Sequence, residues 1–309
     1  VSKFEDEVIS IDWEVKEGTQ TGLFGNSNVE RRKDLLKEIS KKQHDFFIPE
    51  NHDKKAIAQK IKNLKIDLLI NQLELMIKDK HQTNEPKVTS YKTRALFMKA
   101  QELYFQTLGW QQNIQKLKCI KENPTTTLNF FDWKLDFPEI LNPALVGNQA
   151  GFDIVIGNPP YVGISKLQDK NILEKANFQT FESTGDVYSL FYEMGNNLLK
   201  TRGNLCFITS NKWLRASYGK SLRKYFIENT NPIQLIDFGQ TMIFETAIVH
   251  SNIFIFQKYR NLKKLQAVQF EQDLYKNNLS IENYFEKHKI IISHFDETIW
   301  TIASNSVAL

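Results

Sequence analysis

The sequence has little of several features that would place it in a specialised protein class. Its 309 residues include only two cysteines, 13 glycines and eight prolines. Two cysteines can make one disulfide at most, and Cys206 lies in an apolar run, so we expect reduced thiols rather than redox chemistry. No apolar run approaches the roughly eighteen residues that cross a membrane. The opening residues also lack the pattern of a signal peptide, and a cytoplasmic protein is predicted.

Charge of one sign is not in large excess either. The formal net charge of +4 permits a polyanionic partner without requiring one. The six histidines show no metal-ligand spacing and two cysteines cannot build a zinc site alone, so no metal site is predicted. Asp12, Glu14 and Lys16 are similar to the tail of a magnesium-nuclease pattern, but no partner carboxylate lies at a suitable distance upstream. Alternation along a strand is the interpretation we prefer for these three residues.

Hydrophobic periodicity divides the chain into segments. Residues 1–27 are predicted to form a strand and a loop, and residues 28–120 to form lysine-rich amphipathic helices, the last interrupted near Gly109. Across residues 121–260, short β-branched runs alternate with helices, which predicts an α/β fold with a mainly parallel sheet. The last two β-branched runs, "IQLIDFG" and "AIVHSNIFIF", follow each other closely in the sequence. They predict an antiparallel pair of strands at a sheet edge. Residues 261–309 are expected to begin another module.

One short stretch carries most of the chemical information. In "GFDIVIGNPPYVG", an apolar strand that we expect to be buried runs directly into Asn158, Pro159, Pro160 and Tyr161. Reactive groups of an open α/β sheet collect where strands end at the carboxyl edge. The two prolines have a fixed φ and no N–H, so the turn presents carbonyl acceptors without competing donors.

This tetrapeptide predicts a pocket for an aromatic amine. The amide oxygen of Asn158 and the carbonyl of Pro159 can accept both hydrogens of an exocyclic amine, and Tyr161 offers a flat face on which a ring can stack. An ordinary turn is the alternative, because Asn-Pro and Pro-Pro are common at strand ends. A chance match of four specified residues directly after a strand is rare, which favours the functional interpretation.

The motif series resembles a known family. NPPY after an apolar strand resembles the amino-methyltransferases that use S-adenosylmethionine on adenine N6. The order of "FDWKLDFPEIL", "GFDIVIGNPPYV", "GDVYSLF", "NKWLRASYGKSLR" and "LIDFGQTMIF" is similar to the adenine-specific portion of type IIG restriction-modification enzymes, over roughly residues 128–258. The resemblance implies a Rossmann-like methyltransferase sheet with a helical insertion, S-adenosylmethionine as cofactor and double-stranded DNA as partner. It also implies that residues 261–309 begin a downstream target-recognition module.

The same resemblance implies roles for individual residues. Asn158 and Pro159 would hold the N6 hydrogens of a flipped adenine, with Tyr161 stacked on one face of the base and Phe244 on the other. For Phe244, closing an edge strand is the alternative role. Candidates for contacts with the cofactor are Asn129, Phe130, Asp132, Asp186 and Phe191. Among these, Asn129, Phe130 and Asp132 compete for the same roles, and a place in a helical core is the alternative for Phe191.

Basic residues interleaved with aromatic residues follow a later strand. Such groups make phosphate contacts beside a flipped base, and a solvated helix face is the alternative. The candidates for contacts with the DNA backbone are Lys212, Arg215, Lys220 and Arg223.

Two motifs that the resemblance implies are not found in convincing form. These are a glycine-rich turn after the first strand and an acidic residue ending the second; Gly18, Gly22 and Gly25 fit an exposed loop better. In the family's order both motifs would precede residue 1. We therefore expect a piece of a longer polypeptide that extends both upstream and downstream, with an incomplete cofactor site and no activity on its own. An NPPY enzyme acting on RNA or protein glutamine, and a catalytically inert DNA-binding fragment, are the alternatives.

Overall fold

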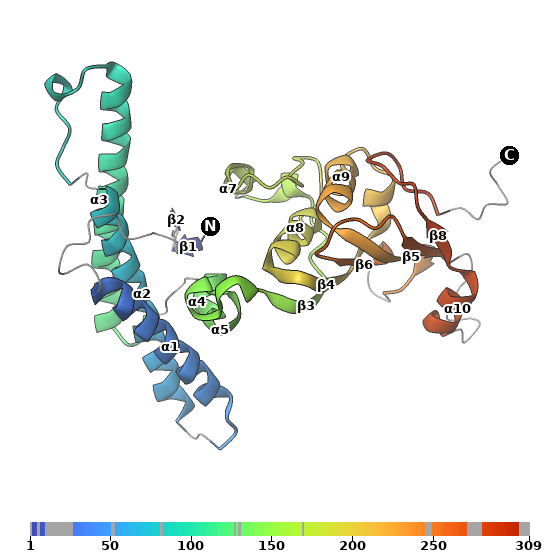
Figure 1. Ribbon diagram of the computed structural model, residues 1–309, viewed down its shortest axis with the longest axis horizontal. Helices are drawn as coiled ribbons and strands as arrows, with labels where there is room; N and C mark the ends of the chain where they lie inside the picture. Colours follow the sequence, from blue (N-terminus) through green and yellow to red (C-terminus); the bar gives the residue numbers. More distant parts are fainter. Residues whose placement is uncertain are drawn as a thin grey trace. The chain divides into compact units, whose positions relative to one another are not determined.

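The computed structural model divides the chain into two units, Val1–Asn148 and Gln149–Leu309, which are described separately (Figure 1). It describes residues 2–4, 7–9, 27–50, 53–80, 83–126, 128, 131–168, 170–244, 249–270 and 280–302. Residues 10–26, which hold the acidic pattern and the glycines considered above, lie outside the described residues. Within the described chain, no helix combines the length and apolarity needed to span a membrane.

Long helices dominate the first unit, as the periodicity predicts. They are α1 (Ser27–Phe47), α2 (Lys54–Lys80) and α3 (Arg94–Glu122). Leucine and isoleucine side chains at helical spacing, such as Leu36 and Leu68, form a shared core with Trp110. The expected interruption near Gly109 is wrong: α3 runs through it, because one glycine costs a helix only about 1 kcal/mol. The same unit holds β1 (Ser2–Phe4), β2 (Glu7–Ile9), α4 (Trp133–Asp136), α5 (Pro138–Leu141) and α6 (Pro143–Val146).

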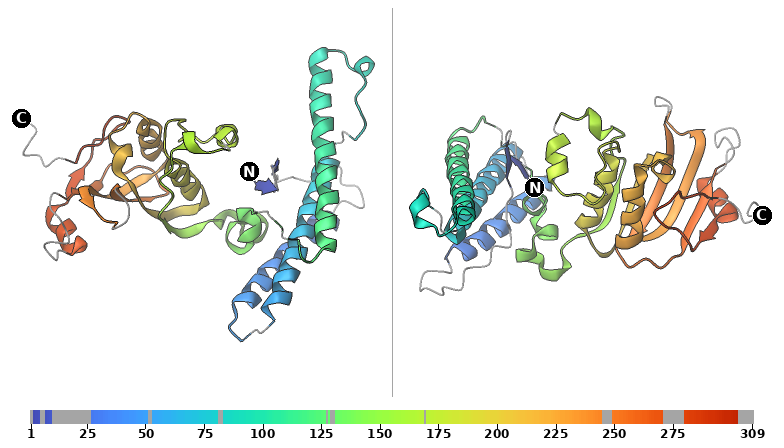
Figure 2. Two further views of the ribbon diagram at one scale, coloured as in Figure 1. Left: turned by 180° about the vertical axis from the view of Figure 1, so that it is seen from behind. Right: turned by 90° about the horizontal axis from the view of Figure 1, so that it is seen from above.

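A six-stranded mixed sheet forms the centre of the second unit, in the order β3-β4-β6-β5-β7-β8 (Figure 2). The strands are β3 (Phe152–Gly157), β4 (Leu199–Ser210), β5 (Asn231–Met242), β6 (His250–Gln257), β7 (Leu265–Gln269) and β8 (Ile290–Ile292). β3 is parallel to β4 and β5 is parallel to β7, whereas β6 is antiparallel to both of its neighbours. The α/β class expected from the sequence is confirmed.

The position of β6 differs from the expectation. β5 and β6 form the predicted antiparallel pair, but β6 lies between β4 and β5 rather than at an edge. Apolar residues of β6 lie on both faces of the sheet, as expected for a central strand. The sheet is therefore mixed rather than mainly parallel, although β3, β4, β5 and β7 all run in one direction. The segment after residue 260 contributes β7 and β8 to this same sheet, and its role in target recognition stays a prediction.

Helices cover the two faces of the sheet unequally. On one face, α8 (Tyr188–Leu198) and α9 (Gly219–Asn229) pack through Tyr192 and Phe226, whose ring centroids lie 5.0 Å apart. On the other face, Phe285 of α10 (Ile281–His288) joins a cluster with residues of β5 and β7. A short helix, α7 (Lys170–Lys175), lies in the connection between β3 and α8.

β3 is more exposed than the sequence suggests. It forms one edge of the sheet, and its Val155 packs against the core beneath α8. Ile154 and Ile156 point to the opposite face and are 65% and 77% exposed. Within the second unit, the expectation of a buried strand before NPPY is therefore wrong, because the elements of that unit cover only one face of β3.

Candidate functional site

The NPPY tetrapeptide lies at the carboxyl end of β3, where the sequence places it. β3 ends at Gly157, which pairs with Phe207 of β4 in the parallel register. Asn158 follows with an exposed side chain, Pro159 is buried and Pro160 is exposed. Since β4 and β5 run in the same direction as β3, their carboxyl ends lie at this same edge of the sheet.

Tyr161 is held from two directions. Its hydroxyl donates a hydrogen bond of 3.1 Å to the backbone carbonyl of Ile208 on β4. The edge of one ring meets the face of the other between Tyr161 and Tyr188, with centroids 6.2 Å apart and planes at 86°. Partial burial raises the pKa of Tyr161 above its usual value. Tyr161 is therefore a fixed, neutral aromatic ring within the NPPY turn.

The chain returns to the NPPY turn just before α8. Gly163 and Asp186 form an antiparallel bridge, and the backbone N–H of Val187 donates to the carbonyl of Val162 over 2.8 Å. The sequence separates Asp186 from NPPY by more than twenty residues, yet the fold brings the two together. Asp186 accepts a hydrogen bond of 3.1 Å from the hydroxyl of Tyr218.

A chain of three polar side chains thus runs along this part of the edge. The hydroxyls of Tyr218 and Tyr188 lie 3.3 Å apart, and Tyr218 also contacts Asp186. Burial is the main cause that raises the pKa of Tyr218 to about 12, with the Asp186 charge contributing. Burial also raises the pKa of Tyr188, so both tyrosines are neutral near pH 7. Phe191, in the first turn of α8, is 43% exposed, which leaves its ring accessible to a ligand.

The remaining candidates for the cofactor fall in the first unit or outside the described residues. Asn129 and Phe130 lie outside the described residues. Asp132 caps the N-terminus of α4, where its Oδ1 accepts hydrogen bonds of 3.0 and 3.1 Å from the backbone N–H groups of Lys134 and Leu135. This contact gives Asp132 a structural role, and its contact with a cofactor stays a prediction.

The second aromatic candidate follows β5. Phe244 is half-buried and lies just beyond Met242, where the strand ends, so it belongs to the same edge as NPPY. Its contact with a base stays a prediction.

The four basic candidates differ in their surroundings. Lys212, Arg215 and Lys220 are exposed, and Lys220 pairs with Glu297 over 3.2 Å. Arg223 is only 3% exposed. Its Nε donates to the carbonyl of Glu297 over 3.0 Å, and it also donates to the carbonyls of Trp213 and Ala216. Burial lowers the pKa of Arg223. These contacts favour a role for Arg223 in packing the segment rather than in binding a phosphate.

Asp237 and Asn211 also lie at this edge, and the sequence did not predict a role for either residue. Asp237 is fully buried on β5, and Asn211 donates a hydrogen bond of 2.7 Å to it. Arg215 also contacts Asp237, over 3.3 Å. An acidic residue inside the apolar run "IQLIDFG" is the signal that would have pointed to this cluster.

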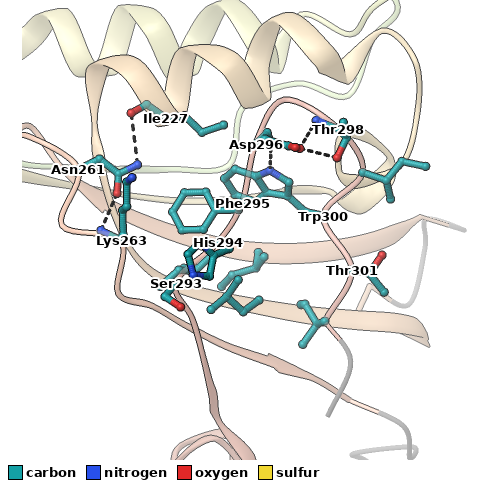
Figure 3. A pocket seen from close by; sticks show the side chains of 15 residues that line it. Ile227, Asn261, Lys263, Ser293, His294, Phe295, Asp296, Thr298, Trp300 and Thr301 are labelled. Carbon is teal, nitrogen blue, oxygen red and sulfur yellow. Dashed lines mark hydrogen bonds between the residues drawn. The ribbon is translucent and has the colours of Figure 1, made fainter. Parts of the chain in front are cut away.

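A cavity of about 480 Å³ lies elsewhere in the second unit (Figure 3). Its walls include Leu235 and Leu265, near the amino ends of β5 and β7, together with Phe295 and Trp300 from the segment after β8. The amino ends of these strands lie opposite the edge that carries NPPY. The cavity contains none of the predicted site residues and is separate from the candidate site.

Comparison with known proteins identifies the family. The model of the Eco57I restriction-modification methylase family matches residues 9–244. The chain belongs to this family. Its motif order and its α/β sheet agree with that membership, which confirms the resemblance drawn from the NPPY series.

Proteins named as type II methyltransferases or restriction enzymes are similar to part of this chain. The type II methyltransferase M.BstVI of Geobacillus stearothermophilus is 29% identical over 137 residues, which are 44% of this chain and 23% of that protein. The type II restriction enzyme and methyltransferase RM.Eco57I of Escherichia coli is 30% identical over 111 residues, 35% of this chain and 11% of that protein. The crystal structure of the type IIG restriction endonuclease BpuSI gives a TM-score of 0.34 at 17% identity, covering 69% of this chain and 27% of that chain.

The chain spans less than a quarter of the length of either relative. Membership of a restriction-modification methylase family is shown by the match, whereas the activity, substrate and partners of the whole protein are proposals.

Proposed function

We propose that this chain carries the catalytic edge of a DNA methyltransferase that modifies the N6 amine of an adenine extruded from the duplex. The observation that carries the proposal is the NPPY tetrapeptide at the carboxyl end of β3, with the ring of its Tyr161 held in place by a hydrogen bond to β4. Family membership supports the reaction class. No observation favours an RNA or protein substrate.

The chemistry follows from the acceptors in the turn. Asn158 Oδ1 and the Pro159 carbonyl accept the two N6 hydrogens, and Pro160 has no N–H to compete with them. Holding both hydrogens draws electron density to N6 and turns its lone pair out of conjugation with the ring. The amine would then act as the nucleophile toward the donor methyl group, whose bond to sulfur breaks as the bond to N6 forms. One of the two N6 hydrogens then leaves as a proton, and a covalent enzyme intermediate is not needed. Tyr161 holds the base by stacking, with Phe244 as the second aromatic face.

The residues of the second unit fit an adenine-bearing cofactor. Phe191 presents a 43% exposed ring in the first turn of α8, and Asp186, just before α8, forms a bridge with Gly163, which follows the NPPY turn. An aromatic face and a carboxylate acceptor match a purine with an exocyclic amine. When bound, S-adenosylmethionine supplies an electrophilic methyl group on a sulfonium sulfur. Asp186 and Phe191 would orient its adenine.

Other parts of the cofactor need further ligands. Among the described residues, none of the strands β3, β4, β5 and β7 ends in a glycine-rich turn that could cradle the methionine part. We therefore propose that the second unit alone holds the cofactor incompletely and that this chain alone transfers no methyl group.

Exposed cations at the same edge suit a DNA backbone. Lys212, Arg215 and Lys220 follow the carboxyl end of β4 and can contact phosphates next to the extruded base. We propose double-stranded DNA as the partner on this basis.

Product analysis tests the proposed function. The full-length natural protein is incubated with unmethylated genomic DNA and labelled S-adenosylmethionine, and the DNA is digested to nucleosides for mass spectrometry. The proposal predicts that the labelled nucleoside is N6-methyl-2′-deoxyadenosine. A labelled methylcytosine, or no label in DNA, contradicts it.

A further inference from the structure

Asp237 joins three parts of the candidate edge through one buried carboxylate. Its side chain has no exposure, although it lies at the edge where β4 and β5 end. Its Oδ1 accepts hydrogen bonds from the Asn211 amide over 2.7 Å and from the Gly239 backbone N–H over 3.0 Å. Its Oδ2 pairs with the Arg215 guanidinium over 3.3 Å. The two carboxylate oxygens therefore have different partners.

The Oδ1 contacts fix the backbone of β5. Gly239 has a φ of +57°, a left-handed conformation that glycine adopts without strain. The regular pairing of β5 with β6 is interrupted between Asp237 and Met242. Asn211 also donates to the carbonyl of Gly239 over 3.2 Å, so two side chains hold this irregular turn. The chain then leads to Phe244.

The Oδ2 contact fixes Arg215. A buried carboxylate that loses its cationic partner is strongly disfavoured, so the guanidinium is held against Asp237. The Arg215 side chain is nevertheless 46% exposed. A guanidinium has five N–H donors in a planar fork, and one contact with Asp237 leaves others directed to solvent. Arg215 is thus a cation of fixed orientation, unlike a freely moving surface lysine.

We propose that Asp237 is a positioning residue that orients the Arg215 guanidinium toward one DNA phosphate beside the extruded base. The inference rests on the proposed function, because it takes DNA as the partner. It adds a division of roles at the edge: Asp237 acts through Arg215 and does not touch DNA, and Arg215 is set apart from the exposed lysines by its orientation.

The substitution Asp237→Asn separates positioning from charge. The asparagine amide oxygen can keep the contacts with Asn211 and Gly239, whereas the charge that holds Arg215 is lost. Simple electrostatics predicts that removing a negative charge tightens binding to DNA. Positioning predicts the opposite sign, because Arg215 keeps its charge and loses its orientation.

The measurement is the affinity of the full-length protein for a fluorescently labelled duplex of mixed sequence, by anisotropy over a series of salt concentrations. We expect Arg215→Ala to weaken binding about tenfold and to reduce the log–log salt slope by about 1. Asp237→Asn should weaken binding about fivefold, and should add nothing to the effect of Arg215→Ala in the double variant. Arg260→Ala is the matched control, since Arg260 is exposed near the opposite ends of β4 and β5.

Arg215→Lys decides the outcome if Asp237→Asn fails to fold. It keeps the charge and loses the planar fork, so positioning predicts weakened binding and charge alone predicts wild-type binding. The inference is overturned if Asp237→Asn or Arg215→Lys binds as tightly as wild type, or if Arg215→Ala behaves like Arg260→Ala. None of these outcomes concerns the binding of DNA by the wild-type protein, so none of them contradicts the proposed function. A wild-type protein that does not bind the duplex contradicts both.

Discussion

The hydroxyl of Tyr161 donates a hydrogen bond of 3.1 Å to the backbone carbonyl of Ile208. Ile208 lies on β4, so the aromatic residue of the NPPY turn is anchored to the strand next to its own. The edge-to-face contact with Tyr188 restrains the ring further. A residue that holds an extruded base needs such a fixed plane, because ordering a mobile ring would cost binding free energy.

Replacing Tyr161 separates its ring from its hydroxyl. Tyr161→Phe keeps the stacking face, so we expect base extrusion to persist with a loss of stability of about 1 kcal/mol. Tyr161→Ala removes the face and should weaken capture of the base by about 1 to 3 kcal/mol. The readout is the fluorescence of 2-aminopurine at the target position, which brightens when the base leaves the stack. Equal brightening in wild type and Tyr161→Ala would show that the ring is not a base platform.

Alanine substitutions at Phe191 and Phe244 should affect different steps, cofactor binding in the first case and base extrusion in the second. Phe191→Ala should weaken S-adenosylmethionine binding by about 1 to 3 kcal/mol and leave the 2-aminopurine signal unchanged. Phe244→Ala should change the 2-aminopurine signal and leave cofactor affinity unchanged. Calorimetry and fluorescence on the full-length protein measure the two quantities. The assignment of the two rings fails if each variant affects both quantities equally.

Two helical glycines should respond to alanine with opposite signs. A Cβ at Gly195 of α8 would clash with Cδ1 of Leu205, which is fully buried, so Gly195→Ala should destabilise the second unit by about 1 to 3 kcal/mol. A Cβ at Gly109 of α3 meets nothing within 4 Å, so Gly109→Ala should stabilise the first unit by about 0.5 to 1 kcal/mol. Urea denaturation of this chain measures both. Destabilisation by Gly109→Ala would contradict the continuous α3.

The helices and the site edge were largely predictable from the sequence, and the sheet order was not. Apolar spacing fixed the helices of the first unit, and Asn158 could be placed because strand ends have a local signature. The central position of β6 depends on pairing between strands distant in sequence, which periodicity does not encode. The exposure of Ile154 and Ile156 was missed for the same reason: an apolar run reports the nature of the side chains but not whether another layer covers them.

Individual contacts within the site were the least predictable part. Asp186 could be proposed from a resemblance, but its bridge to Gly163 arises only when the intervening chain folds back. Arg223 and Lys220 lie three residues apart in one helix, yet only Arg223 is buried. The sequence gives both the same charge and cannot rank their burial. The contact of Asp237 with Arg215 joins two strand ends and has no local signature.

This chain alone should bind S-adenosylmethionine weakly. Asp186 and Phe191 contact only the adenine in our proposal, and the described strand ends offer no cradle for the methionine part. Isothermal titration calorimetry should give little or no heat at micromolar concentrations of cofactor and chain. A micromolar dissociation constant for the isolated chain would show that the cofactor site has been misplaced.

The most direct test of the central claim is the rate of methyl transfer by Asn158→Ala in the full-length protein. Asn158 is proposed to act on the amine in the transition state, so the rate should fall at least about a hundredfold, the scale for losing one preorganised polar contact to a reacting group. DNA affinity and 2-aminopurine brightening should stay near wild type, because the base is held by the aromatic residues. If Asn158→Ala methylates adenine at the wild-type rate, the NPPY turn has no catalytic role and the account is contradicted.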